Sequence, residues 1–108
     1  MFNDVRQRII MSKDITDFQR KVYLELMNVK AGEVITYGEL ARRIGCRSAQ
    51  AVGQALHKNP FAPEVPCHRV ISADGSIGGY AFGVEKKMEL LKNEGVTGIF
   101  LKQGNGLK

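Results

Sequence analysis

A cysteine and a histidine stand next to each other at Cys67 and His68, directly after Pro66. A thiolate is a strong nucleophile, but a free thiol has a pKa of about 8.5 and needs a base or a positive field to ionise at neutral pH. His68 could be that base, directly or through a water. Direct contact is awkward, because successive side chains of a strand point to opposite faces, so a bridging water or a bend at Pro66 is the expected geometry. A carboxylate would best orient the imidazole, and Glu94 and Asp74 are both candidates. Taken alone, an inert buried thiol is the commoner reason for a free cysteine.

Hydrophobic periodicity predicts the helices that would position this pair. Apolar residues at a spacing of about 3.6, among them Val22 and Leu26, indicate a helix that begins at Phe18, takes Asp17 as its N-cap and ends before Gly32. Further helices are expected over residues 37–44, 49–58 and 84–93, and a capping-box pattern at 36–39 opens the first of these. Two short helices joined by a tight glycine-containing turn, as at 37–44 and 49–58, are typical of a helix-turn-helix.

The other segments predict strands, turns and loops. Residues 68–71 and 96–102 are expected to form short strands, 73–76 a turn with the Asp-Gly pattern of a hairpin, and 78–83 a glycine-rich loop. Residues 1–14 are weakly patterned and could be a short arm or strand. The expected organisation is an N-terminal arm over 1–17, one domain over 18–102 and a flexible tail over 103–108.

Composition limits the classes of partner. Sixteen Lys and Arg against eleven Asp and Glu give a net charge of +5, which fits a polyanion such as nucleic acid and fits equally a merely basic globular protein. No apolar run approaches the roughly 20 residues of a membrane span, and the N-terminus has no apolar signal region, so we expect a cytoplasmic protein with no membrane contact. Two cysteines and two histidines match no zinc spacing, so no metal site is expected.

The segment from Pro66 to Val70, Pro-Cys-His-Arg-Val, resembles the active-site motif of the O6-alkylguanine-DNA alkyltransferases. Residues 34–41 and 51–60 are similar to the two helices of that family's DNA-binding motif, and 78–80 and 90–95 to its substrate loop and last helix. These segments occur in family order over roughly residues 18–96. The resemblance implies the catalytic domain alone: mostly α with short strands, a winged-helix-like helix-turn-helix DNA-binding domain.

The resemblance also implies roles for single residues in a transfer that uses no cofactor. Cys67 would accept the alkyl group, His68 would act as base through a water, and Glu94 would hold the histidine. Asn59 would brace the loop that carries the cysteine. Tyr37 would contact the DNA backbone, help turn the nucleotide outward and give a proton to the departing guanine. The target atom lies inside the base stack, so the base must be flipped out of the duplex.

Two further groups of residues follow from the same resemblance. The partner would be double-stranded DNA that contains alkylated guanine, bound by a monomer. The residues expected to contact DNA are Tyr37, Arg47, Ala49, Gln50, Ala51 and Gly53. The residues expected to line the guanine pocket are the backbone of Val70 and the loop residues Gly78, Tyr80 and Ala81. Arg69 would be buried and structural.

Three features depart from the family pattern. The family usually has an N-terminal domain, where this chain has about 17 residues before the first expected helix. Gln50 stands where the family places an arginine that fills the space left by the flipped base, and glutamine lacks its charge and stacking plane. Ala81 stands where many members have a hydroxyl that bonds guanine O6. These changes bear on flipping and binding rather than on the type of reaction.

Two alternatives come from other classes of protein. The alkyltransferase-like proteins bind alkylated DNA and flag it for excision without repairing it. They usually replace the reactive cysteine, often by tryptophan, whereas this chain has Cys67 and no tryptophan. A helix-turn-helix regulator would explain the basic charge and the two short helices, but it leaves the Pro-Cys-His-Arg-Val motif unexplained.

Overall fold

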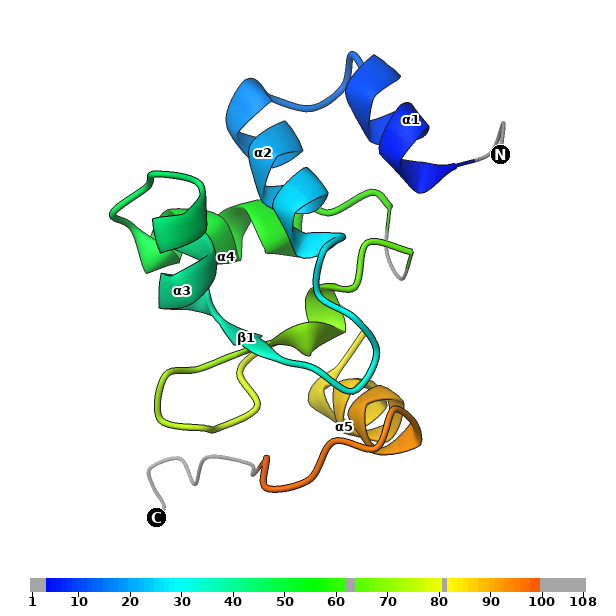
Figure 1. Cartoon of the computed structure of the whole chain (residues 1–108), viewed down its shortest axis with the longest axis vertical. Helices are drawn as coiled ribbons and strands as arrows, with labels where there is room; N and C mark the ends of the chain where they lie inside the picture. Colours follow the sequence, from blue (N-terminus) through cyan, green and yellow to red (C-terminus); the bar gives the residue numbers. More distant parts are fainter. Residues whose placement is uncertain (1–3, 62–63, 81, 100–108) are drawn as a thin grey trace.

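The computed structural model describes residues 4–61, 64–80 and 82–99. Within these residues the chain forms five α-helices, one 3-10 helix and two short strands (Figure 1). In chain order they are α1 (Val5–Met11), α2 (Asp17–Leu26), β1 (Ile35–Thr36), α3 (Tyr37–Arg43), α4 (Ala49–His57), η1 (Cys67–Arg69), β2 (Val70–Ile71) and α5 (Val84–Asn93). This is the mostly helical fold with short strands that the sequence predicts. None of the described helices has the length and apolar character to cross a bilayer.

The helix-turn-helix consists of α3 and α4, which pack against each other and against α2. Thr36 caps α3 by accepting the Glu39 N–H at 3.0 Å, and Ser48 caps α4 by accepting the Ala51 N–H at 3.0 Å. Gly45 ends α3 with a φ of +74°, a conformation that glycine adopts without steric cost. Only half of the predicted capping box forms, because the Glu39 carboxylate pairs with arginines of its own helix.

The first two helices differ from the sequence prediction. Thr16, not Asp17, is the N-cap of α2: its hydroxyl accepts the Gln19 N–H at 3.0 Å, and Gln19 Oε1 accepts the Thr16 N–H at 2.7 Å. This reciprocal pair satisfies two N–H groups, so Asp17 becomes the first helical residue. Residues 5–11 form a helix where a short arm or strand was expected, and this helix buries Ile9 completely.

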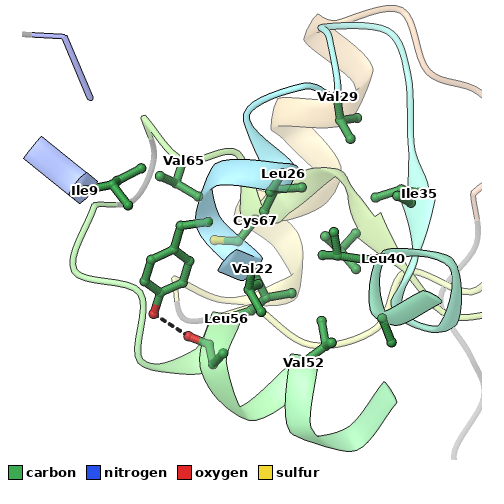
Figure 2. Close-up of a cluster of buried hydrophobic side chains, with 14 residues drawn as sticks. Ile9, Val22, Leu26, Val29, Ile35, Leu40, Val52, Leu56, Val65 and Cys67 are labelled. Atoms are coloured by element: carbon green, nitrogen blue, oxygen red, sulfur yellow. Dashed lines mark hydrogen bonds between the residues drawn. The ribbon is translucent and has the colours of Figure 1, made fainter. Parts of the chain in front are cut away.

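The hydrophobic core joins buried side chains of α1, α2, α3 and α4 to Val65, Cys67 and Val70 (Figure 2). Its α2 members Val22 and Leu26 lie on the face that the helical periodicity predicts, and both are fully buried. Tyr23 is also buried and donates from its hydroxyl to the Ala55 carbonyl of α4 at 2.6 Å. Cys67 is part of this cluster, so the core itself holds one wall of the site.

The segment around the cysteine is a 3-10 turn followed by a strand, rather than the strand over 68–71 that the sequence predicts. The Arg69 N–H bonds the Pro66 carbonyl at 2.9 Å and closes the turn directly after the proline. Only Val70 and Ile71 are extended, and they pair in parallel with Ile35 and Thr36. Residues 96–99 form no strand, while residues 100–102 of the expected last strand and the expected tail 103–108 lie outside the described residues.

Candidate active site

Cys67 lies at the wall of a cavity between α3, α4 and the glycine-rich loop. Its side chain belongs to the buried core, with 6% of the residue exposed. The cavity has a volume of about 190 Å³. The residues that line it are Tyr37, Gly53, Leu56, His57, Cys67, Gly79 and Tyr80. The sulfur therefore lies at a cavity that the helix-turn-helix and the glycine-rich loop share.

His68 and Arg69 both bind the carboxylate of Glu94, which follows the end of α5. His68 Nε2 is 2.9 Å from Glu94 Oε2, and Arg69 donates to the two Glu94 oxygens at 2.9 and 2.8 Å. Arg69 also donates to the Val29 carbonyl at 2.7 Å. The Arg69 guanidinium, and then His68, lower the pKa of Glu94 to about 2, so the carboxylate is ionised at neutral pH. Of the two candidate carboxylates, Glu94 is the one beside the imidazole; Asp74 accepts the Ser76 N–H at 2.9 Å.

This arrangement assigns different roles to the two ring nitrogens of His68. An ionised carboxylate only accepts hydrogen bonds, so Nε2 carries the proton in the neutral imidazole. Nδ1 is buried and has no hydrogen-bond partner among the described residues. It is therefore the nitrogen that can accept a proton. No hydrogen bond joins His68 directly to Cys67 in the described part of the chain.

Asn59 ties together the loop that carries the cysteine. Its Oδ1 accepts the Phe61 N–H at 2.8 Å, and its Nδ2 donates to the Val65 carbonyl at 3.3 Å. The Cys67 N–H in turn bonds the same Val65 carbonyl at 2.7 Å. Burial raises the pKa of the Cys67 thiol, while the Asn59 amide and the charge of Lys87 lower it.

Tyr37 also lines the cavity and lies against the glycine-rich loop. Burial raises the pKa of its phenol, and the charge of Cys67 adds to this effect. Gly78 has a φ of +72°, and a β-carbon there would lie 3.0 Å from the Tyr37 hydroxyl. Gly53 faces the same ring, with its β-position 3.9 Å from Cε1. Small residues at 53 and 78 thus leave room for the ring.

The expected DNA and substrate residues fall into two environments. Arg47, Ala49 and Gln50, at the start of α4 and in the turn before it, are exposed. Ala51 and Gly53 are half-buried on the same helix. Val70 is fully buried in the short strand pair, and Tyr80 lines the cavity with a buried hydroxyl that has no partner among the described residues. Ala81 lies outside the described residues.

The sequence prediction missed Lys87. This α5 residue has no exposed surface; its ammonium donates to the Gly79 carbonyl at 2.9 Å and lies 5.9 Å from the ring centre of Tyr37. Burial lowers its pKa to about 8, and the charge of Cys67 acts in the opposite direction. The signal was available in the sequence, because Lys87 falls on the apolar face of the predicted helix, one turn before Leu91.

The described residues contain no group of three or more His, Cys, Asp or Glu side chains that could hold a metal ion. The chemistry that the site supports directly is that of a thiol, an imidazole oriented by a carboxylate, and phenols. A buried thiol beside such a pair suits nucleophilic attack on a small electrophilic group that enters the cavity.

Comparison with known proteins places this geometry in a family. The sequence model described as "6-O-methylguanine DNA methyltransferase, DNA binding domain" matches residues 17–96. A methylated-DNA–protein-cysteine methyltransferase of Saccharomyces cerevisiae is 44% identical over 89 residues, which cover 82% of this chain and 47% of the relative. The chain thus spans about half the length of the curated relatives it matches.

Solved structures agree with the sequence match. OGT of Mycobacterium tuberculosis in complex with DNA is 47% identical, with a TM-score of 0.72 over 74% of this chain and 50% of that protein. An S. pombe ATL protein in complex with DNA is 38% identical, with a TM-score of 0.66 over 84% of each chain. This chain therefore belongs to the 6-O-methylguanine DNA methyltransferase family, of which it carries the DNA-binding domain.

Proposed function

We propose that this protein repairs DNA by transferring an alkyl group from O6 of guanine to the sulfur of Cys67, once per molecule. The observation that carries the proposal is the position of Cys67 at the cavity wall, next to an imidazole held by the ionised carboxylate of Glu94. The family's curated members bear the name of this activity. The thioether product has no easy route back to the thiol, so each molecule would react a single time.

The proposed reaction is a displacement at carbon. The thiol proton of Cys67 passes through a water to Nδ1 of His68, whose other nitrogen is fixed by Glu94. The thiolate attacks the alkyl carbon, so a sulfur–carbon bond forms while the bond from carbon to guanine O6 breaks. The electrons of the broken bond stay with guanine, which takes up a proton. Tyr37, which lines the cavity and is neutral at pH 7, is the proposed donor.

DNA would reach this cavity through the helix-turn-helix. The second helix of such a motif enters the major groove with its N-terminal residues toward the bases, and here these are the exposed Ala49 and Gln50. Extruding the target nucleotide costs a few kcal/mol, and least for a poorly paired lesion. Gln50 would occupy the vacated space in the duplex, and Arg47 would contribute charge close by.

The test is an intact-mass measurement after incubation with a duplex that contains one O6-methylguanine. The protein should gain one methyl group, peptide mapping should place it on Cys67, and Cys67→Ala should bind the duplex without gaining mass. Cys46→Ala is the matched control and should react like the wild type. A wild-type protein that binds the lesion and stays unmodified would refute the transfer.

That outcome would instead support a second function, recognition of alkylated DNA without repair. The specific observation in its favour is the likeness to the S. pombe ATL protein that was solved in complex with DNA. The presence of Cys67 at the cavity wall favours transfer.

A further inference from the structure

Lys87 is a buried cation that has no acidic partner in the described part of the chain. It has no exposed surface, and burying an ammonium group is costly unless a counter-charge or several hydrogen bonds compensate it. No carboxylate among the described residues forms an ion pair with it. Its interactions are with the Gly79 carbonyl at 2.9 Å and the Tyr37 ring.

These contacts place the ammonium directly behind two residues that line the cavity of the cysteine. Gly79 and Tyr37 are both lining residues of that cavity, and Cys67 is a third. The charges of Lys87 and Cys67 act on each other: the ammonium favours the thiolate, and the thiolate favours the ammonium. A thiolate in the cavity would therefore supply the counter-charge that Lys87 lacks.

The other groups around the sulfur do not supply a fixed positive charge. Tyr23, Tyr37 and Tyr80 are phenols whose pKa values are raised, so they are neutral at pH 7. His68 faces Glu94 through Nε2 and makes no hydrogen bond to the cysteine among the residues described. Asn59 offers only a neutral amide. His57, at the cavity mouth, is exposed to solvent.

We propose that Lys87 is a positioning residue whose ammonium stabilises the thiolate of Cys67 and, through the Gly79 carbonyl, holds the glycine-rich loop against that thiolate. The inference rests on the proposed function only where it treats this thiolate as the attacking group. His68 then serves to remove the thiol proton, and Lys87 stabilises the anion that forms as the thiol attacks the alkylated base. A merely structural lysine would tether Gly79 without changing the ionisation of the thiol.

The rate at which iodoacetamide alkylates Cys67 measures this ionisation without DNA. The rate is followed against pH in wild type, Lys87→Gln and Lys87→Arg, with peptide mass spectrometry separating Cys67 from Cys46. Lys87→Gln should raise the apparent thiol pKa by at least about one unit, which makes alkylation at pH 7 roughly tenfold slower. Lys87→Arg, which keeps the charge, should stay near the wild-type profile.

Lys86→Gln is the matched control, because Lys86 is the preceding residue of the same helix, is half-exposed and pairs with Glu89 at 3.2 Å. It makes the same change in net charge and should leave the thiol profile unchanged. A Lys87→Gln profile identical to wild type would overturn the proposal. So would an equal shift in Lys87→Gln and Lys87→Arg, since that would show a requirement for the lysine's shape and not for its charge.

A reciprocal measurement keeps the proposal testable if Lys87→Gln fails to fold. In Cys67→Ser the anionic partner is gone, so the pKa of Lys87, followed by NMR of labelled lysine, should fall below its wild-type value of about 8. An unchanged value would overturn the inference. The proposed function fails separately. A wild type that never takes up methyl from DNA can still show the coupled titration of Lys87 and Cys67. A wild type that does take up methyl can lack this coupling.

Discussion

Replacing Glu94 by glutamine tests the array around His68 in a single substitution. The amide keeps the shape of the side chain but removes the charge that two Arg69 hydrogen bonds and one His68 contact share. Arg69 would keep the Val29 carbonyl and one amide oxygen as acceptors, but it would lose the second acceptor and the ion pair. The fall in the pKa of Glu94 from 4.5 to about 2 corresponds to roughly 3 kcal/mol in favour of the ionised form. In a domain of this size the loss should lower Tm by roughly 10–20 °C.

The stabilisation that Glu94 provides depends on pH. The pKa of Glu94 is lower in the folded state, so its contribution to stability is complete above about pH 4.5 and is lost as pH falls toward about 2. The difference in the free energy of unfolding between wild type and Glu94→Gln should therefore be largest near neutral pH and should shrink through this window. Urea titrations followed by circular dichroism measure it at each pH. A difference that stays constant down to about pH 2 would refute the assignment.

The same variant reports on the proposed transfer. Without an ionised carboxylate the imidazole loses its fixed tautomer, and loss of general-base catalysis typically costs a factor of about 10² to 10⁴. We expect slower methyl uptake by Glu94→Gln with unchanged binding to lesion DNA, measured where both proteins are folded. Glu89→Gln, on the exposed face of α5, is the control and should react at the wild-type rate. An unchanged rate in Glu94→Gln would remove Glu94 from the mechanism.

Two other substitutions test how the site is supported. Ile9→Ala should lower the free energy of unfolding by about 2–5 kcal/mol in urea titrations, because Ile9 is fully buried. Ile10 is 53% exposed, so Ile10→Ala should change this free energy by less than about 0.5 kcal/mol. Equal effects of the two substitutions would mean that α1 is not docked as described. Gly78→Ala should lower Tm, since its φ of +72° costs an L residue about 1–2 kcal/mol and its β-carbon would lie 3.0 Å from the Tyr37 hydroxyl. Gly79→Ala, with nothing within 4 Å of its β-position, should be closer to wild type in Tm, and the opposite order would contradict the loop geometry.

The helices α3, α4 and α5 were predictable because residues near their ends mark where they begin and stop. Ser48 and Thr36 cap helices that follow at once, and Gly45 lies directly after a helix end. The α5 range of 84–93 matches the prediction residue for residue. Such signals act within one turn of helix, so a single sequence contains all that is needed to read them.

The N-terminal helix was not predictable, because its stability comes from distant residues. Seven residues are too few for a helix that is stable in isolation. Arg20 of α2 donates to the carbonyls of Ile9, Ile10 and Ser12, which satisfies the C-terminal end of α1. Ile9 is buried against the core at the same time. Neither interaction leaves a periodic pattern in a segment this short.

Part of the candidate site was also predictable from local sequence, and part depends on contacts between distant residues. The Cys-His pair is adjacent in sequence and could be found by inspection, but the choice between Glu94 and Asp74 depends on how the chain after η1 returns to it. His68 and Glu94 are 26 residues apart. Asp74 is closer in sequence but serves its own turn, where it accepts the Ser76 N–H. Proximity along the chain was therefore no guide to which carboxylate orients the imidazole.

Lys87 shows which kind of exception in a sequence pattern points to function. On the buried face of α5 it stands one turn before Leu91, a position where leucine or methionine would fill the space without any cost of burying charge. A lysine there lowers stability unless an anion forms beside it. The described carboxylates do not provide that anion, and the thiol of Cys67 can. A buried cation on an otherwise apolar helix face is thus better explained by the charge that develops in the cavity than by the packing of the helix.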